Sequence, residues 1–104
     1  MMKGNTLREI RFKDGHRIAK GDLILIAWPD PKLQATRVQV HHADRLLNVP
    51  AVTALAWIGL AVSMAELEEA TFDGTCETPN GHSVEPDGVD PQGVPSWLLI
   101  HGLI

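Results

Sequence analysis

The sequence predicts a mainly β protein, a small SH3-like barrel of about five strands with a short C-terminal helix. Two neighbouring stretches carry this prediction. Residues 23–28 form an unbroken apolar run closed by Pro29-Asp30-Pro31, which is typical of a strand covered on both faces. Residues 36–41 then alternate apolar with polar side chains, as a strand with one buried face does. We expect the two to pair antiparallel at the centre of the sheet, with the prolines in a loop of about five residues.

A short hairpin is expected before this pair. Residues 7–12 have the pattern of a strand, with Ile10 and Phe12 on one side. Asp14-Gly15 supplies a tight turn, because Gly tolerates a positive φ and Asp bonds its own backbone. Residues 16–18 would form a brief return strand.

Residues 46–64 are almost wholly apolar, so their periodicity does not separate strand from helix. We favour a strand over residues 52–60, which are rich in Val, Thr, Trp and Ile, with a bulge at Gly59. A short helical link and a last strand over residues 70–72 would then complete the barrel.

Two other interpretations of this segment stay open. In an α+β alternative, a helix at about 50–69 packs on a small sheet, with Asn48 as its cap and Pro50 near its first turn. In the other, the segment spans a membrane, since it has about the minimum length and every basic residue lies before it. Asn48, Pro50 and several small residues dilute that signal, so we do not expect a membrane partner.

The chain after residue 72 is rich in turns. Gly- and Pro-containing pairs recur over residues 73–95, and Asn80-Gly81 is placed to close a small hairpin between Cys76 and Val84. These pairs leave little room for long helices or strands.

The last residues, 96–104, form an apolar tail. Ser96 and Gly102 are suited to cap a helix of one or two turns. We expect this tail to pack on the barrel, because its large apolar side chains would otherwise be an aggregation liability. In the functional alternative, it inserts into a groove of a partner or of a second copy of the chain, giving a homodimer.

Length and composition predict one domain over residues 1–104. An apolar content of 44% and a charged content of 21% are those of a folded chain, and 104 residues suffice for one core. Within it we expect the barrel at 1–72, the turn-rich loop at 73–95 and the tail at 96–104.

Charge is divided unevenly along the chain. All nine Lys and Arg residues lie between Lys3 and Arg45, and the residues after Arg45 hold eight acids and no Lys or Arg. The halves either interleave and neutralise each other, or the acidic half docks on a partner with a basic surface. The candidate partner-binding residues are Glu66, Glu68, Glu69, Asp73, Glu77, Glu85, Asp87, Asp90 and Trp97.

The basic half supports an alternative function, an SH3-like nucleic-acid-binding module. Nucleic acid is the less favoured partner, because few aromatic residues are left for a base-stacking platform once the core has taken its share. The candidate residues are Arg8, Arg11, Lys13, Arg17, Lys20 and Arg37.

The sequence carries no recognisable catalytic or metal site. Trp28-Pro29-Asp30 matches the general-acid loop of tyrosine phosphatases, but no Arg follows Cys76 to hold a phosphate. His41, His42, Cys76 and His82 have side chains that zinc accepts, yet adjacent histidines on a strand point to opposite faces. We therefore expect no enzyme, no metal and no cofactor.

Three parts of the chain resemble small proteins encoded by Mu-like transposable phages and prophages. They are residues 11–15, the segment from Gly21-Asp22 to Trp28-Pro29-Asp30, and the run from residue 86 to residue 98. The resemblance implies a phage protein that binds and modulates a host or anti-phage-defence protein without catalysis. A single cysteine and no apolar leader indicate the cytoplasm of the bacterial host.

Overall fold

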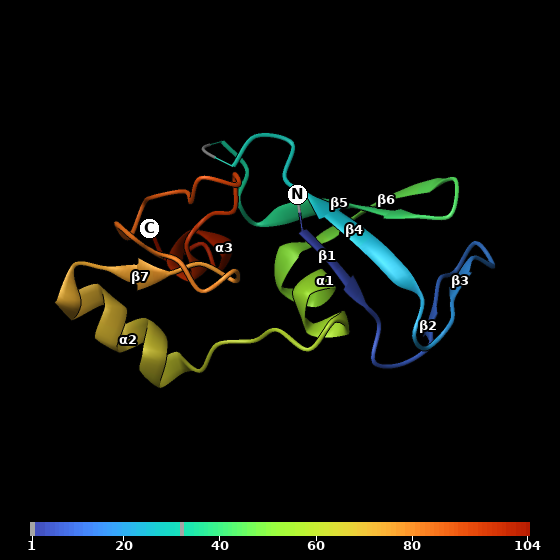
Figure 1. The fold of residues 1–104 in the computed structure, drawn as a ribbon, viewed down its shortest axis with the longest axis horizontal. Helices are drawn as coiled ribbons and strands as arrows, with labels where there is room; N and C mark the ends of the chain where they lie inside the picture. The colour runs from blue at the N-terminus through green and yellow to red at the C-terminus, as the bar shows by residue number, and fades with distance from the viewer. Residues whose placement is uncertain (1, 32) are drawn as a thin grey trace.

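Four antiparallel strands form the main sheet of the structure, a computed structural model that describes residues 2–31 and 33–104 (Figure 1). They are β1 (Met2–Asn5), β4 (Leu23–Ala27), β5 (Arg37–His42) and β6 (Arg45–Pro50), in the order β1-β4-β5-β6. The mainly β prediction is confirmed, as is the pairing of the two predicted central stretches, which sets Ile26 opposite Val40. β4 ends at Ala27 and β5 begins at Arg37, so the connection between them is longer than predicted.

The period of two gives this sheet one face whose centre is apolar and buried. Ile24 and Ile26 of β4 are fully buried, and so are Val38 and Val40 of β5. Leu23, on the other face of β4, keeps 53% of its surface exposed. The prediction that residues 23–28 are covered on both faces is therefore wrong.

The strand predicted over residues 52–60 is a helix, α1 (Ala51–Trp57), that packs on β5 and β6. Ala51, Ala54 and Leu55 are fully buried, and their spacing of three and four residues is that of one helix face. This burial outweighs the β propensity of neighbouring side chains. The helix ends at Trp57, and the chain turns away at Gly59, whose φ of +84° only glycine adopts without strain.

The strand predicted over residues 70–72 is the last turn of a second helix, α2 (Met64–Asp73). A capping box starts it: the Ser63 hydroxyl accepts from the Glu66 backbone N–H at 3.1 Å, and the Glu66 carboxylate accepts from the Ser63 N–H at 3.2 Å. The alternative prediction of a helix at about 50–69 is right in type. Gly59 divides that segment into two helices, and the second continues to Asp73.

The sheet stays open, because the two segments predicted to complete a barrel are helical. Among the residues that the structure describes, β1 and β6 each pair with one neighbour only. Asn48, predicted as a helix cap, lies in β6, where its side-chain oxygen accepts from Arg37 Nε at 2.7 Å. None of the helices in the described ranges has the length and apolar character needed to cross a lipid bilayer.

The C-terminal half contains β7 (Cys76–Glu77), β8 (Ser83–Val84) and α3 (Trp97–Ile100). The predicted hairpin at Asn80-Gly81 is confirmed, with Cys76 opposite Val84. Ser96 caps α3 as predicted, accepting from the Leu99 N–H at 3.2 Å. The helix is mostly buried, so the tail packs back on the protein, although Ile104 at its end is 60% exposed.

The short hairpin of β2 (Ile10–Arg11) and β3 (Arg17–Ile18) forms around the predicted Asp14-Gly15 turn. It is shorter than predicted, and so small a hairpin is marginal alone. Two polar contacts attach it to the main sheet. Asp14 pairs with Arg45 of β6, and His16 contacts His42 of β5.

The histidine contact is part of a three-member chain of hydrogen bonds. His42 Nε2 lies 2.9 Å from Asp22 Oδ2, and His42 Nδ1 lies 3.0 Å from His16 Nε2. The hydrogen bond from His42, with one from the Ala19 backbone N–H, holds the pKa of Asp22 below its ordinary value. Since an ionised carboxylate only accepts, His42 donates to Asp22 through Nε2–H. In the neutral form of His42, Nδ1 then accepts from His16 Nε2–H, so the carboxylate sets the tautomers of both rings.

We predict that His42→Phe loosens the hairpin, because the contact between His16 and the sheet is lost. Hydrogen exchange at the Phe12 amide, which donates to the His16 carbonyl at 2.9 Å, should become about fivefold faster, the effect of one hydrogen bond. His41→Phe, on the adjacent β5 residue, is the control and should leave this exchange rate unchanged. Equal rates in the wild type and both variants would contradict the docking role of the histidines.

Candidate protein-binding groove

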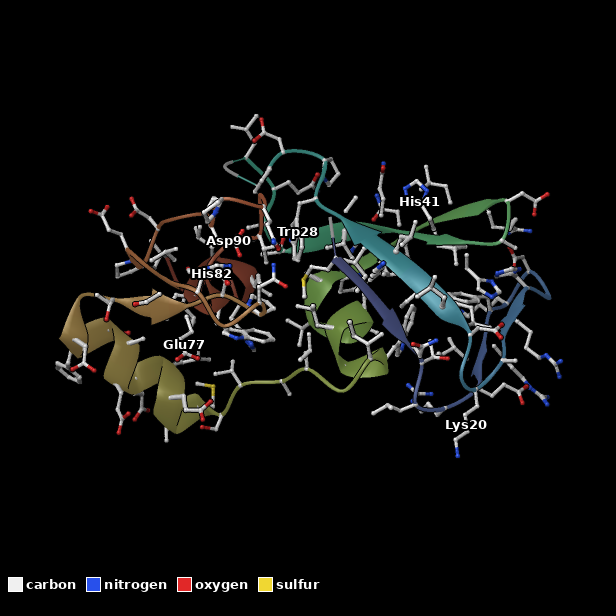
Figure 2. All side chains as sticks on the ribbon, in the orientation of Figure 1. Lys20, Trp28, His41, Glu77, His82 and Asp90 are labelled. Atoms are coloured by element: carbon white, nitrogen blue, oxygen red, sulfur yellow. The ribbon has the colours of Figure 1, made fainter. Side chains whose placement is uncertain are left out.

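The acids of the second half lie at one end of an elongated molecule of 43 × 25 × 21 Å, and basic residues, together with acids of the first half, lie at the other. Helix α2 and strand β7, which carry five acids, are at one end, and β2 and β3 are at the other (Figure 1). Figure 2 shows Glu77 and Lys20 correspondingly far apart along the long axis. The halves are therefore not interleaved. Within residues 2–31 and 33–104, every ion pair uses an acid of the first half: Glu9, Asp14 or Asp22.

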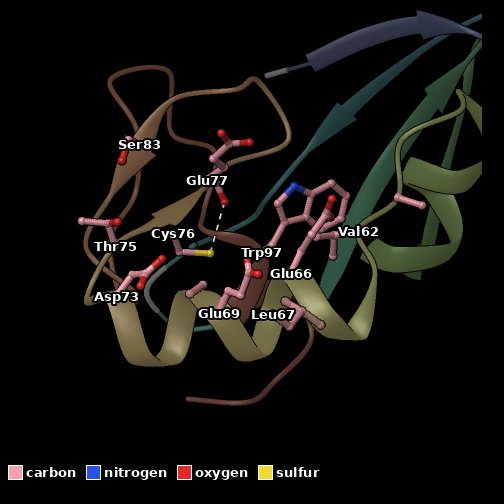
Figure 3. A pocket seen from close by; sticks show the side chains of 12 residues that line it. Val62, Glu66, Leu67, Glu69, Asp73, Thr75, Cys76, Glu77, Ser83 and Trp97 are labelled. Carbon is pink, nitrogen blue, oxygen red and sulfur yellow. Dashed lines mark hydrogen bonds between the residues drawn. The ribbon is translucent and has the colours of Figure 1, made fainter.

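A groove of about 490 Å³ opens between α2, β7, β8 and Trp97 of α3 (Figure 3). Both acidic and apolar side chains line it. The lining consists of Ala61, Val62, Glu66, Leu67, Glu69, Ala70, Asp73, Thr75, Cys76, Glu77, Ser83 and Trp97. Its volume lies in the range of sites that hold a small ligand or a few residues of a peptide.

Helix α2 places three carboxylates along this groove. Glu66, Glu69 and Asp73 are spaced by three and four residues, so they share one face of the helix. Figure 3 shows all three rising from α2 on the side of Cys76 and Trp97. Like charges at this spacing repel, and Asp73 lies at the C-terminal end of the helix, where the dipole disfavours an anion. This arrangement does not favour the stability of the helix.

The floor of the groove is apolar. Leu67 is 1% exposed, Cys76 is 5% exposed and Trp97 is 7% exposed. The Cys76 thiol donates to the Glu77 backbone carbonyl at 3.4 Å, so it is held inside rather than presented to a reactant. No group of side chains in the described part of the chain has the arrangement of a metal site.

The structure brings part of the predicted partner-binding set together. Five of its nine members line the groove: Glu66, Glu69, Asp73, Glu77 and Trp97. Glu77 contributes from β7, and Figure 3 shows its carboxylate turned away from α2. Three others are exposed but lie outside the lining: Glu68, Glu85 and Asp87.

The structure buries two members of the set, Asp90 and Trp97. Trp97 still reaches the groove, whereas Asp90 does not line it. Sequence reasoning missed the apolar floor and the uncharged rim residues Thr75 and Ser83. The spacing of the three α2 acids is the signal that would have shown their shared face.

The predicted nucleic-acid residues do not form one stripe. Arg11 and Arg17 are direct cross-strand neighbours on the β2–β3 hairpin, with Glu9 beside both at 2.5 and 3.9 Å. Arg8 and Lys13 are exposed next to them in the sequence. Arg37, however, lies at the opposite end of β5 from the histidine that contacts the hairpin. The remaining member, Lys20, is exposed in the turn before β4.

Asp90 organises the turn-rich segment beside the groove. Its Oδ1 accepts from the backbone N–H groups of Gln92 and Val94, both at 2.9 Å. Its Oδ2 accepts from the Thr78 hydroxyl at 3.0 Å and from the Asn80 amide at 3.3 Å. One carboxylate thus connects the β7–β8 turn to the residues that lead into α3. The groove depends on this connection, because β7 and α3 supply two of its sides.

Burial tends to raise the pKa of Asp90, but the hydrogen bonds from Val94, Thr78, Gln92 and Asn80 together hold it below the ordinary value. Because the folded-state pKa is the lower one, ionised Asp90 stabilises the fold fully above the unfolded-state pKa of about 3.9. That contribution disappears as the pH falls through the folded-state value.

We predict that Asp90→Asn lowers the free energy of unfolding by about 2 kcal/mol at pH 7. The NH2 group of the new side chain would face the Thr78 hydroxyl and the Asn80 amide, which are themselves donors to this position. Urea unfolding measures this loss, and the gap between variant and wild type should narrow below pH 4. Asp87→Asn, in the same segment but exposed, should change the free energy by less than about 0.5 kcal/mol. Equal losses in the two variants would contradict the role given to Asp90.

Comparison of the chain with protein-family models, curated proteins and solved structures found no match.

Proposed function

We propose that the protein is a non-catalytic binding module that docks its acidic groove on a basic surface of a partner protein. One observation supports this most directly. Glu66, Glu69 and Asp73 share the groove, and within the described residues no ion pair with Lys or Arg neutralises them. A partner cation would relieve their repulsion, and the end-to-end division of charge would steer such a surface toward the groove.

Exposed apolar side chains on α2, outside the groove lining, favour a protein over a small ion as the partner. On α2, Met64 is 62% exposed and Phe72 is 89% exposed. Aromatic residues and Met are enriched in protein–protein interfaces, where apolar contact supplies much of the binding free energy. Acidic side chains alone would give a weak contact in water, because exposed ion pairs contribute little.

The resemblance to small proteins of Mu-like phages and prophages supports a role for the protein during phage infection or prophage maintenance in a bacterium. In that setting the partner is a host or anti-phage-defence protein in the bacterial cytoplasm, and binding modulates its activity. The chain would act by occupying a surface, since no catalytic group is required for that function.

A second candidate function is nucleic-acid binding by the basic first half. The observation that favours it is the cross-strand pair of Arg11 and Arg17, since like charges directly opposite each other are unfavourable without an anion. Glu9 already supplies one carboxylate there, which lowers the attraction for phosphate. Salt-dependent retention on DNA or RNA that Arg11→Gln with Arg17→Gln abolishes would select this function.

The proposed function is tested by affinity capture from bacterial lysate with charge-matched variants. Wild-type protein should retain one stoichiometric partner, and Glu69→Lys with Asp73→Lys should weaken its binding by at least about tenfold, because two attractions become repulsions. Glu85→Lys with Asp87→Lys makes the same change of net charge outside the groove and should retain the partner. If both double variants lose it equally, or wild type retains none, the groove is not the binding site.

A further inference from the structure

Besides the α2 carboxylates, the indole N–H of Trp97 is a second feature of the groove that indicates a ligand. The side chain is nine-tenths buried, yet its Nε1–H makes no hydrogen bond to any residue in the described ranges. Trp28, by contrast, donates from Nε1 to the Ala35 carbonyl at 3.0 Å. A buried tryptophan N–H usually has an acceptor, so this one is available to a bound molecule.

The N–H group has an opening through which an acceptor can reach it. Among the described residues, no fully enclosed side-chain nitrogen or oxygen lacks a partner, so the Trp97 nitrogen keeps some contact with solvent. Trp97 lines the groove, and Figure 3 shows its nitrogen on the ring edge nearest Glu77. The same hollow therefore offers a hydrogen-bond donor at one side and carboxylates along α2.

We propose that the groove binds an arginine of an extended partner segment. The guanidinium lies among Glu66, Glu69 and Asp73, and a neighbouring backbone carbonyl accepts from Trp97 Nε1. This inference rests on the proposed function and names the chemistry that the partner presents.

Each requirement of the groove excludes a simpler ligand. A free polyamine supplies cations but no acceptor for the Trp97 N–H, and a bare metal ion finds no suitable set of ligands in the described part of the chain. Arginine fits the acidic stripe better than lysine, because its planar fork bonds carboxylates in pairs and is less strongly hydrated. Its methylene stem would lie on Leu67 and Val62, which line the groove.

The test uses a blocked seven-residue peptide with a central arginine and the full-length protein labelled with nitrogen-15. Titration should shift the Trp97 indole N–H resonance, and the same peptide with citrulline, which lacks the charge, should bind at least about tenfold more weakly. Spermidine should leave that resonance in place. Equal shifts with citrulline or spermidine, or no shift with the arginine peptide, would overturn the inference.

Matched variants locate the contact. Glu69→Gln should weaken peptide binding about fivefold and Trp97→Phe by a similar factor, each removing one hydrogen-bonded contact, while Glu68→Gln on the adjacent α2 residue should have no effect. Thermal unfolding checks that each variant folds, and if Trp97→Phe does not, Asp73→Asn replaces it. Equal weakening by Glu68→Gln would also overturn the inference.

Failure here can be distinguished from failure of the proposed function. If groove-dependent capture of a partner persists while the arginine peptide does not bind, the inference fails and the proposed function stands. If capture does not depend on the groove, the proposed function itself fails.

Discussion

The structure has to accommodate eight carboxylates in a half-chain that contains no Lys or Arg, and much of its C-terminal half follows from that constraint. Asp90 is buried and receives four hydrogen bonds, so it becomes the centre of the turn-rich segment. Glu66 starts a helix through its capping box. Among the residues that the structure describes, Glu69 and Asp73 have no such partner, and both line the groove. The groove therefore presents two carboxylates that have no structural role in the fold, while Glu68, Glu85 and Asp87 are exposed outside it.

Local signals in the sequence predict the elements that local interactions decide. The β4–β5 pair, the Asn80-Gly81 hairpin and the Ser96 cap depend on side chains next to the backbone that they fix. Strand β6 could not be predicted, because the turn before it has no local sequence signal. Its hairpin with β5 turns at Ala43-Asp44, and Ala43 takes a positive φ of 55°, which turn chemistry assigns to Gly or Asn. Once β6 ended at Pro50, the apolar residues that follow could cover the sheet as a helix.

The candidate site was predictable in composition and not in arrangement. The excess of acids after Arg45 is visible in the sequence. From the sequence, however, we predict a strand over residues 70–72, where α2 continues to Asp73. The helical face that Asp73 shares with Glu66 and Glu69 is therefore not predicted. Asp87 and Asp90 look alike in a string of turns, and only the folded chain separates the exposed residue from the buried one. The free N–H of Trp97 depends on which acceptors tertiary packing brings near, and no local pattern encodes that.

The central claim is that the groove carboxylates repel one another and that a bound cation would relieve this repulsion. The free energy of unfolding of Glu69→Gln, measured by urea at low and high salt, tests it most directly. Glu69 has like-charged neighbours three residues before and four after, so its neutralisation should stabilise the protein by about 0.5 kcal/mol at low salt and by less at high salt. Glu68 has no acid at those spacings, and Glu68→Gln should give no gain. A loss of stability in Glu69→Gln, or a gain that does not change with salt, would contradict the account.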